Sequence, residues 1–196
     1  MSLYSTSTRW GTPARLFHWV MAAGIVFMVG FGLWMTGLPP SMRKLNVYAL
    51  HKSVGITLLG LIVLRLLWRA LDRRPQAVPG QPPWQTVAAK ITHAATYALL
   101  FVVPLSGWLY NSASGFPLRW FKLVNLPRLS ESDPALKATA HAVHEYGVWA
   151  LVVLVALHAG AALKHHFVDR DPTLSAMVPF LNAPGPARTS AASSRE

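Results

Sequence analysis

Cysteine is absent from this chain of 196 residues. Its absence excludes disulfide bonds, thiolate metal sites, iron–sulfur clusters and covalently attached c-type haem, which requires a C-x-x-C-H segment. Any metal that the chain binds must therefore be held by histidine, methionine or oxygen ligands.

Charged residues, and acidic ones above all, are scarce. Only 13% of the chain is charged and 53% is hydrophobic, with a mean hydropathy of +0.34. A typical soluble domain carries about a quarter charged residues, so this composition argues against a water-soluble protein. Eighteen Lys and Arg against seven Asp and Glu give a net charge of +11, which in a soluble chain would suggest nucleic acid binding. Here the basic residues lie mostly between long apolar runs, so membrane lipid and not nucleic acid is the expected partner.

Four apolar stretches are long enough to cross a bilayer, which takes roughly 20 mostly apolar residues in a helix. They cover about residues 16–38, 47–68, 91–110 and 140–167. The first is too long for a cleaved signal peptide and lacks an A-x-A exit. The predicted fold class is therefore all-α, an integral membrane four-helix bundle over residues 1–180.

The connecting segments differ in character. Residues 69–90 are basic and proline-rich, which predicts a short semi-rigid link with no room for a domain. Residues 111–139 contain the aromatic-basic cluster LRWFKL, which suggests a segment lying along the membrane interface. The tail over 181–196 is of low complexity and is predicted to be disordered.

The distribution of basic residues predicts the orientation. Eleven of the eighteen Lys and Arg lie on the side that holds both termini and the link between the second and third spans. The other side holds seven, which are Arg43, Lys44, Lys52, Arg119, Lys122, Arg128 and Lys137. Cytoplasmic loops are enriched in Lys and Arg, so both termini are predicted to be cytoplasmic.

Eight histidines are many for so short a membrane chain, and all of them fall in or beside the spans. Ionisable groups at membrane depth are costly, so each is a candidate functional residue. Acidic residues are nearly absent from the spans, with only Glu145 near one end. A proton-coupled transporter usually needs buried carboxylates, so this class is disfavoured.

Two histidines of the fourth span have an informative spacing. His144 and His158 are 14 residues apart. At about 100° and 1.5 Å per residue, they lie on nearly one face and about 21 Å apart along the axis. This arrangement suits two haems stacked across the membrane, each iron taking one imidazole from this helix.

Each iron then needs a second axial ligand from another helix at the same depth. His18, at the inner end of the first span, is level with His158. His51, at the outer start of the second span, is level with His144. The alternative is that these interfacial histidines only cap helix ends or reach the headgroups.

The motifs around these histidines resemble the prokaryotic cytochrome b561 family of dihaem membrane proteins. They are RLFHW around His18, LHKSVG around His51, HAATYALLFVVPLSGWLY from His93 and HAVHEYGVWALVVLVALHAGAALKHHF from His141. Together they cover roughly residues 9–180.

The resemblance implies a four-helix bundle in the bacterial inner membrane that holds two b-type haems per chain by bis-histidine ligation. The matching positions are His18, His51, His144 and His158. Six-coordinate iron with two imidazoles has no open position for oxygen chemistry, so it relays electrons. The family exchanges electrons with the quinone pool. Similar members are associated with superoxide oxidation at the periplasmic face and ubiquinone reduction, and others serve as haem subunits of hydrogenases or formate dehydrogenases.

Four further residues near the inner haem are candidates for contacting a quinone or a haem propionate. They are Arg65, His93, His165 and His166. For Arg65 the alternative is contact with lipid headgroups. For the two histidines at the end of the fourth span it is a basic helix end that favours its own dipole. No catalytic residue is identified, and His141 is expected to be solvated.

Three hypotheses for the function follow. The leading one is an oxidoreductase that passes electrons through two haems to ubiquinone, with superoxide as the outer donor, drawn in by the basic residues of that side. The first alternative is a haem-bearing membrane anchor that connects a partner dehydrogenase or hydrogenase to quinone. The second alternative is a haem-free small transporter.

Overall fold

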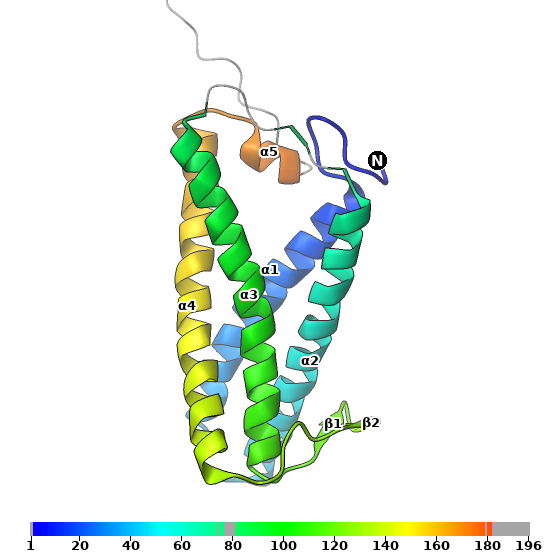
Figure 1. Cartoon of the computed structure of the whole chain (residues 1–196), viewed down its shortest axis with the longest axis vertical. Coiled ribbons are helices and arrows are strands. Elements are labelled where there is room, and N and C mark those ends of the chain that lie inside the picture. Colours follow the sequence, from blue (N-terminus) through cyan, green and yellow to red (C-terminus); the bar gives the residue numbers. More distant parts are fainter. Residues whose placement is uncertain (1, 74, 77–80, 179, 182–196) are drawn as a thin grey trace, which may run out of the picture.

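The structure is a computed structural model that describes residues 2–73, 75–76, 81–178 and 180–181. Its main elements are four long helices, with a small hairpin of two strands between the third and fourth (Figure 1). The helices are α1 (Thr12–Thr36), α2 (Met42–Leu71), α3 (Pro83–Ala113) and α4 (Pro134–Phe167), followed by the short α5 (Thr173–Met177). The tail is predicted to be disordered over residues 181–196, and of these, residues 182–196 lie outside the described part of the chain.

The four long helices confirm the all-α prediction. Each is long and apolar enough to cross a membrane, with mean hydropathies of 1.4 to 2.0. All four are longer than the apolar stretches, and polar side chains cap the extended starts of α2 and α4. Ser41 accepts the backbone N–H of Lys44 at the start of α2, and Asp133 accepts two backbone N–H groups at the start of α4. The link over 69–90 is correspondingly shorter, since α2 continues to Leu71 and α3 begins at Pro83.

The LRWFKL cluster forms part of a β-hairpin, which its sequence pattern does not predict. Its residues contribute strand β1 (Leu118–Trp120), which pairs antiparallel with β2 (Val124–Leu126). The turn between them has two residues in the left-handed region, Phe121 (φ 46°) and Lys122 (φ 64°). Ser53 of α2 accepts the Phe121 backbone N–H at 2.9 Å, so the hairpin is attached to the side of the bundle.

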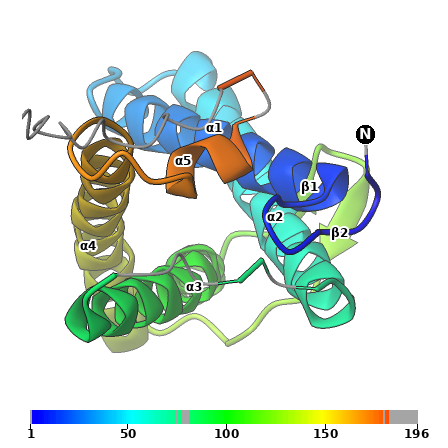
Figure 2. The same ribbon diagram turned by 90° about the horizontal axis from the view of Figure 1, so that it is seen from above.

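The helices pack in sequence around the bundle. α1 packs against α2, α2 against α3, and α3 along most of α4 (Figure 2). The short α5 and the N-terminal segment lie at one end, here called the α5 end, and the strands lie at the other, the hairpin end. The buried apolar residues are few: Met21, Met35, Ile62, Ala113, Leu118, Ala140 and Leu151. Most large apolar side chains face outward, as in a bundle whose surroundings are lipid.

The N-terminal segment is attached to the α5 end. Asp72 accepts hydrogen bonds from the backbone N–H and the hydroxyl of Ser5, at 2.9 and 2.6 Å. Tyr4 stacks on Trp68 of α2, with ring centroids 5.7 Å apart. Burial by itself would raise the pKa of Asp72, but its hydrogen bonds from Ser5 and Arg73 together lower the pKa.

Candidate functional site

At the hairpin end, α2 and α4 bring two imidazoles together. The ring centroids of His51 and His144 are 6.4 Å apart. Nδ1 of His144 lies 2.8 Å from the carbonyl oxygen of Val103 in α3. A carbonyl only accepts, so Nδ1 carries the proton and Nε2 keeps its lone pair, which is the nitrogen that a metal would use.

Glycines let these imidazoles lie against neighbouring helix backbones. A Cβ at Gly107 of α3 would lie 3.0 Å from His144, and a Cβ at Gly32 of α1 would lie 3.4 Å from Cε1 of His51. Phe31 stacks on the His51 ring with centroids 6.2 Å apart. The buried Nδ1 of His51 has no hydrogen-bond partner among the described residues. This end is therefore shaped around two rings, and within the described part of the chain no hydrogen bond occupies Nε2 of either one.

At the α5 end, three imidazoles from three helices converge. The centroids of His18 and His158 are 6.1 Å apart, and those of His93 and His158 are 5.3 Å apart. The histidines predicted to be level with one another are thus neighbours at both ends, and α4 contributes one ring to each group. The additional contact of His93 was not predicted, because the sequence places it only near the inner boundary.

Arg65 takes part in this group in a way that the sequence does not reveal. Its Nη2 lies 3.3 Å from Nδ1 of His18, and its guanidinium lies 5.6 Å from the Tyr97 ring centroid. A guanidinium only donates, so in this arrangement Nδ1 of His18 accepts and the neutral ring carries its proton on Nε2. Binding of a metal at Nε2 of His18 therefore requires Arg65 to turn away, for example toward an anionic group such as a propionate.

The spacing of the paired rings fits a shared metal. A metal–imidazole bond is about 2 Å long, so two imidazoles on opposite sides of one ion have centroids about 6 Å apart. The observed 6.1 and 6.4 Å agree with this spacing at both ends of the bundle. The donor sets therefore fit an iron porphyrin, with His144 already in the required tautomer.

A family model of prokaryotic cytochrome b561 matches residues 9–180. The chain belongs to this family. It is 37% identical over 179 residues to cytochrome b561 homolog 2 of Escherichia coli K12, covering 91% of this chain and 95% of the relative. It is 28% identical over 162 residues to a probable superoxide oxidase, CybB, of Yersinia pestis, covering 83% and 91%. It is 25% identical over 210 residues to a probable Ni/Fe-hydrogenase B-type cytochrome subunit of Cupriavidus necator, covering 85% and 82%.

Membership of the prokaryotic cytochrome b561 family confirms the resemblance seen in the sequence. This b561-family chain is a multi-pass bacterial membrane protein, and the family implies b-type haem, electron transport and a quinone or redox partner. The histidine pairs are the residues in the described structure whose geometry suits that cofactor.

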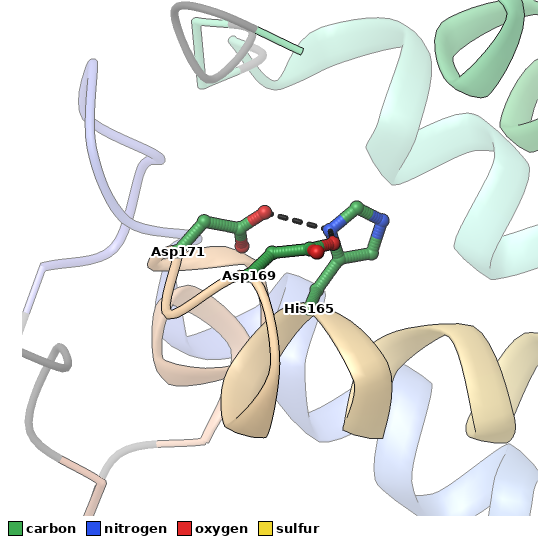
Figure 3. A group of neighbouring side chains, drawn as sticks. All are labelled: His165, Asp169 and Asp171. Carbon is green, nitrogen blue, oxygen red and sulfur yellow. Dashed lines mark hydrogen bonds and ion pairs between the residues drawn. The ribbon is translucent and has the colours of Figure 1, made fainter. Parts of the chain in front are cut away.

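The remaining predicted site residues lie near the α5 end, with different surroundings. His165 points toward Asp169 and Asp171 (Figure 3). Its Nδ1 lies 2.7 Å from Oδ2 of Asp171 and 3.1 Å from Oδ2 of Asp169. His166 packs edge-on against Phe167, and its buried Nδ1 has no hydrogen-bond partner among the described residues. The two aspartates follow α4 in the sequence without any motif that marks them, so only the folded chain shows their contact with His165.

Proposed function

We propose that this chain transfers electrons through two b-type haems between a donor at the hairpin end and the quinone pool at the α5 end. The pairs His18–His158 and His51–His144 would hold the two irons. The observation that carries the proposal is the presence, at opposite ends of one bundle, of two imidazole pairs with the centroid spacing that a shared iron requires.

The chain's own residues prepare the sites for electron relay. When bound, a b-type haem supplies one-electron redox chemistry, and two imidazole ligands leave no open position for oxygen. Val103 holds the ring of His144 in orientation through its carbonyl, and α4 provides one ligand to each pair. Because these ligands lie on packed helices, they would hold a bound haem with little structural change between its redox states.

For the α5 end we propose quinone reduction. Arg65, His93, His165 and His166 all lie at this end and can donate hydrogen bonds to quinone or propionate oxygens. His165, two turns beyond His158 on α4, has the best-defined orientation of the four, because carboxylates hold one of its ring nitrogens. Ubiquinone is the expected acceptor.

For the hairpin end we propose superoxide as the electron donor. In the part of the chain that the structure describes, none of the seven Lys and Arg at this end forms an ion pair with a carboxylate. Several donate to neutral oxygens instead, as Lys52 does to Asn111 and Lys44 to the carbonyl of Leu38. Uncompensated positive charge steers small anions to a surface. The same distribution of charge favours a periplasmic hairpin end and cytoplasmic termini in the inner membrane.

Haem loading tests the ligand assignment. The purified protein should show a low-spin b-type spectrum on reduction, with about two haems per chain. The variants His144→Ala and His158→Ala should each retain about one, whereas His141→Ala should retain two because the His141 side chain is 56% exposed. A colourless preparation, or full loading of both ligand variants, would contradict the assignment.

An assay of haem reduction by superoxide distinguishes an oxidoreductase from a membrane anchor that needs a partner protein. The isolated chain should have its haems reduced by superoxide and reoxidised by added ubiquinone, and the superoxide rate should fall as salt is added. A rate that does not respond to salt would contradict steering by the basic residues.

A second candidate is a haem-bearing anchor for a partner dehydrogenase or hydrogenase. It is supported by the similarity to the probable hydrogenase cytochrome subunit of Cupriavidus necator. This candidate predicts that the isolated chain is not reduced by superoxide and needs a partner protein as donor. Membership of a cytochrome family argues against the haem-free transporter.

A further inference from the structure

His165, near the end of α4, is held by the carboxylate of Asp171, which follows that helix. Its Nδ1 lies 2.7 Å from Oδ2 of Asp171, and Asp171 also donates its backbone N–H to the His165 carbonyl at 3.0 Å. A carboxylate only accepts, so Nδ1 of His165 carries a proton. The second ring nitrogen, Nε2, points away from both neighbouring carboxylates (Figure 3). The imidazole is thus oriented with Nδ1 hydrogen-bonded, while Nε2 has no hydrogen-bond partner among the described residues.

The two aspartates beside His165 are not equivalent. The Asp171 side chain is 11% exposed and the Asp169 side chain is 29% exposed. Lys164 donates to both oxygens of Asp169, at 2.7 and 2.8 Å, which neutralises that carboxylate. Asp171 instead accepts from the Thr173 backbone N–H and from Gln81. Asp171 is therefore the carboxylate whose charge is left for His165.

A metal ion is a poor fit to this cluster, although His165, Asp169 and Asp171 each offer an atom within 4.8 Å of the others. Every carboxylate oxygen already accepts a hydrogen bond from a side-chain or backbone donor. A cation would have to displace the Lys164 ammonium from Asp169 and the proton from Nδ1 of His165. The hydrogen bonds present account for the cluster without a metal.

We propose that Asp171 is a positioning residue that keeps the proton of His165 on Nδ1, so that His165 exchanges protons with quinone only through Nε2. This inference rests on the proposed quinone reduction at the α5 end. Burial by itself would raise the pKa of Asp171, but the hydrogen bonds from Thr173 and Gln81 and the nearby His165 lower it, so the carboxylate stays ionised. An ionised Asp171 accepts the hydrogen bond from Nδ1–H of His165, so proton exchange by the ring is left to Nε2.

The step that His165 serves is the protonation of reduced quinone. Quinone takes two electrons, one at a time, and two protons to become quinol. The imidazolium of His165 transfers its Nε2 proton to the carbonyl oxygen that it faces and regains a proton from water. The second carbonyl oxygen takes its proton from water. Asp171 is not protonated at any point, because it acts only on Nδ1.

The variant Asp171→Asn separates orientation from charge. The Thr173 N–H lies 2.8 Å from Oδ1 of Asp171, so it holds the amide oxygen of the new side chain and leaves the amide nitrogen facing His165. An amide nitrogen only donates, so it faces Nδ1 of His165 as a donor and favours the tautomer with the ring proton on Nε2. Asp169, 3.1 Å from Nδ1, is the remaining acceptor, but both of its oxygens are engaged by Lys164. Asp169→Asn is the matched control, since Lys164 already neutralises Asp169.

Nitrogen NMR of histidine-labelled, fully reduced holoprotein in mildly alkaline buffer tests this directly, with the His165 signals assigned from His165→Gln. The wild type and Asp169→Asn should show the proton on Nδ1, and Asp171→Asn should show it on Nε2. The same tautomer in all three proteins would overturn the inference. An unchanged haem spectrum in each variant shows that the bundle is intact.

Kinetics with ubiquinone-1 complete the test. Reoxidation of reduced haem should be at least about tenfold slower in Asp171→Asn, with the loss greatest at high pH, and little changed in Asp169→Asn. Asp171→Glu should recover part of the rate because it restores a carboxylate. If the wild type is not reoxidised by ubiquinone-1, the proposed function itself fails and the inference with it. If the wild type is reoxidised but Asp171→Asn matches Asp169→Asn, only the inference fails.

Discussion

A Cβ atom added at Gly107 would lie 3.0 Å from both Nδ1 and Cε1 of His144. The imidazole therefore lies directly against the backbone of α3, where it also donates to the carbonyl of Val103. Two residues on α3 thus determine the position and the tautomer of a ring that belongs to α4. The orientation of this ring depends on how closely the two helices pack.

Gly107→Ala should displace His144 and lower haem binding at the hairpin end. The added methyl group meets the ring itself, which cannot move without weakening its hydrogen bond to Val103. We expect the haem content to fall from about two toward one per chain, measured by the pyridine haemochrome assay. Gly60→Ala is the control, because a Cβ there meets nothing within 4 Å and alanine is the better helix former. Equal haem content in the two variants would contradict this role of Gly107.

Arg65→Gln should change the reduction potential at the α5 end only. A positive charge beside a haem favours its reduced form, so removing the guanidinium near His18 should lower the potential of one of the two haems. A redox titration followed by absorbance should show one component shifted downward and the other unchanged. Lys137→Gln, at the hairpin end, should leave the α5-end component in place. If both components shift equally in Arg65→Gln, the prediction that the Arg65 charge acts on one haem only is wrong.

Ser53→Ala should loosen the hairpin. The buried Ser53 hydroxyl accepts the Phe121 backbone N–H at 2.9 Å and donates to the Ala49 carbonyl. Its loss leaves the N–H without that partner, at a cost of roughly 1–3 kcal/mol. Hydrogen exchange should be faster for residues of the hairpin than in the wild type, while exchange at the α5 end should not change. Ser114→Ala, whose hydroxyl bonds only within its own turn to Tyr110, is the control.

The attachment of the N-terminal segment should depend on pH through Asp72. Because the hydrogen bonds lower its pKa below the unfolded value of about 4, the contribution of Asp72 to stability is present above about pH 4. It should be lost as the pH falls through the lower, folded pKa. Tryptic cleavage after the exposed Arg9 at neutral pH should be several-fold faster in Asp72→Asn, since the bonds of Ser5 to the carboxylate are weakened.

The same variant provides the test of the pH dependence. In the wild type, detachment of the segment should increase in acid. It can be followed by the change in fluorescence as Tyr4 leaves Trp68, whereas Asp72→Asn should show the same signal across that pH range. Glu131→Gln, at the opposite end, should behave as the wild type. An acid transition that persists in Asp72→Asn would assign the effect to another group.

Much of the architecture follows from local patterns. The apolar stretches predicted the four membrane helices, and the spacing of His144 and His158 on one helix predicted a ring near each end of the bundle. Both inferences need only the length and the period of a single helix. The form of the LRWFKL cluster did not follow, because its pairing depends on a buried serine of α2 that is remote in sequence.

The amino-acid sequence alone therefore determined the number of membrane-spanning helices, their apolar character and the depth of each histidine, since these are properties of each helix by itself. Only the tertiary structure decided that His93 also approaches His158, that Arg65 reaches His18, and that Asp171 orients His165. Such contacts depend on the rotation and the separation of packed helices and on the path of the chain after α4. No periodicity within one segment contains that information.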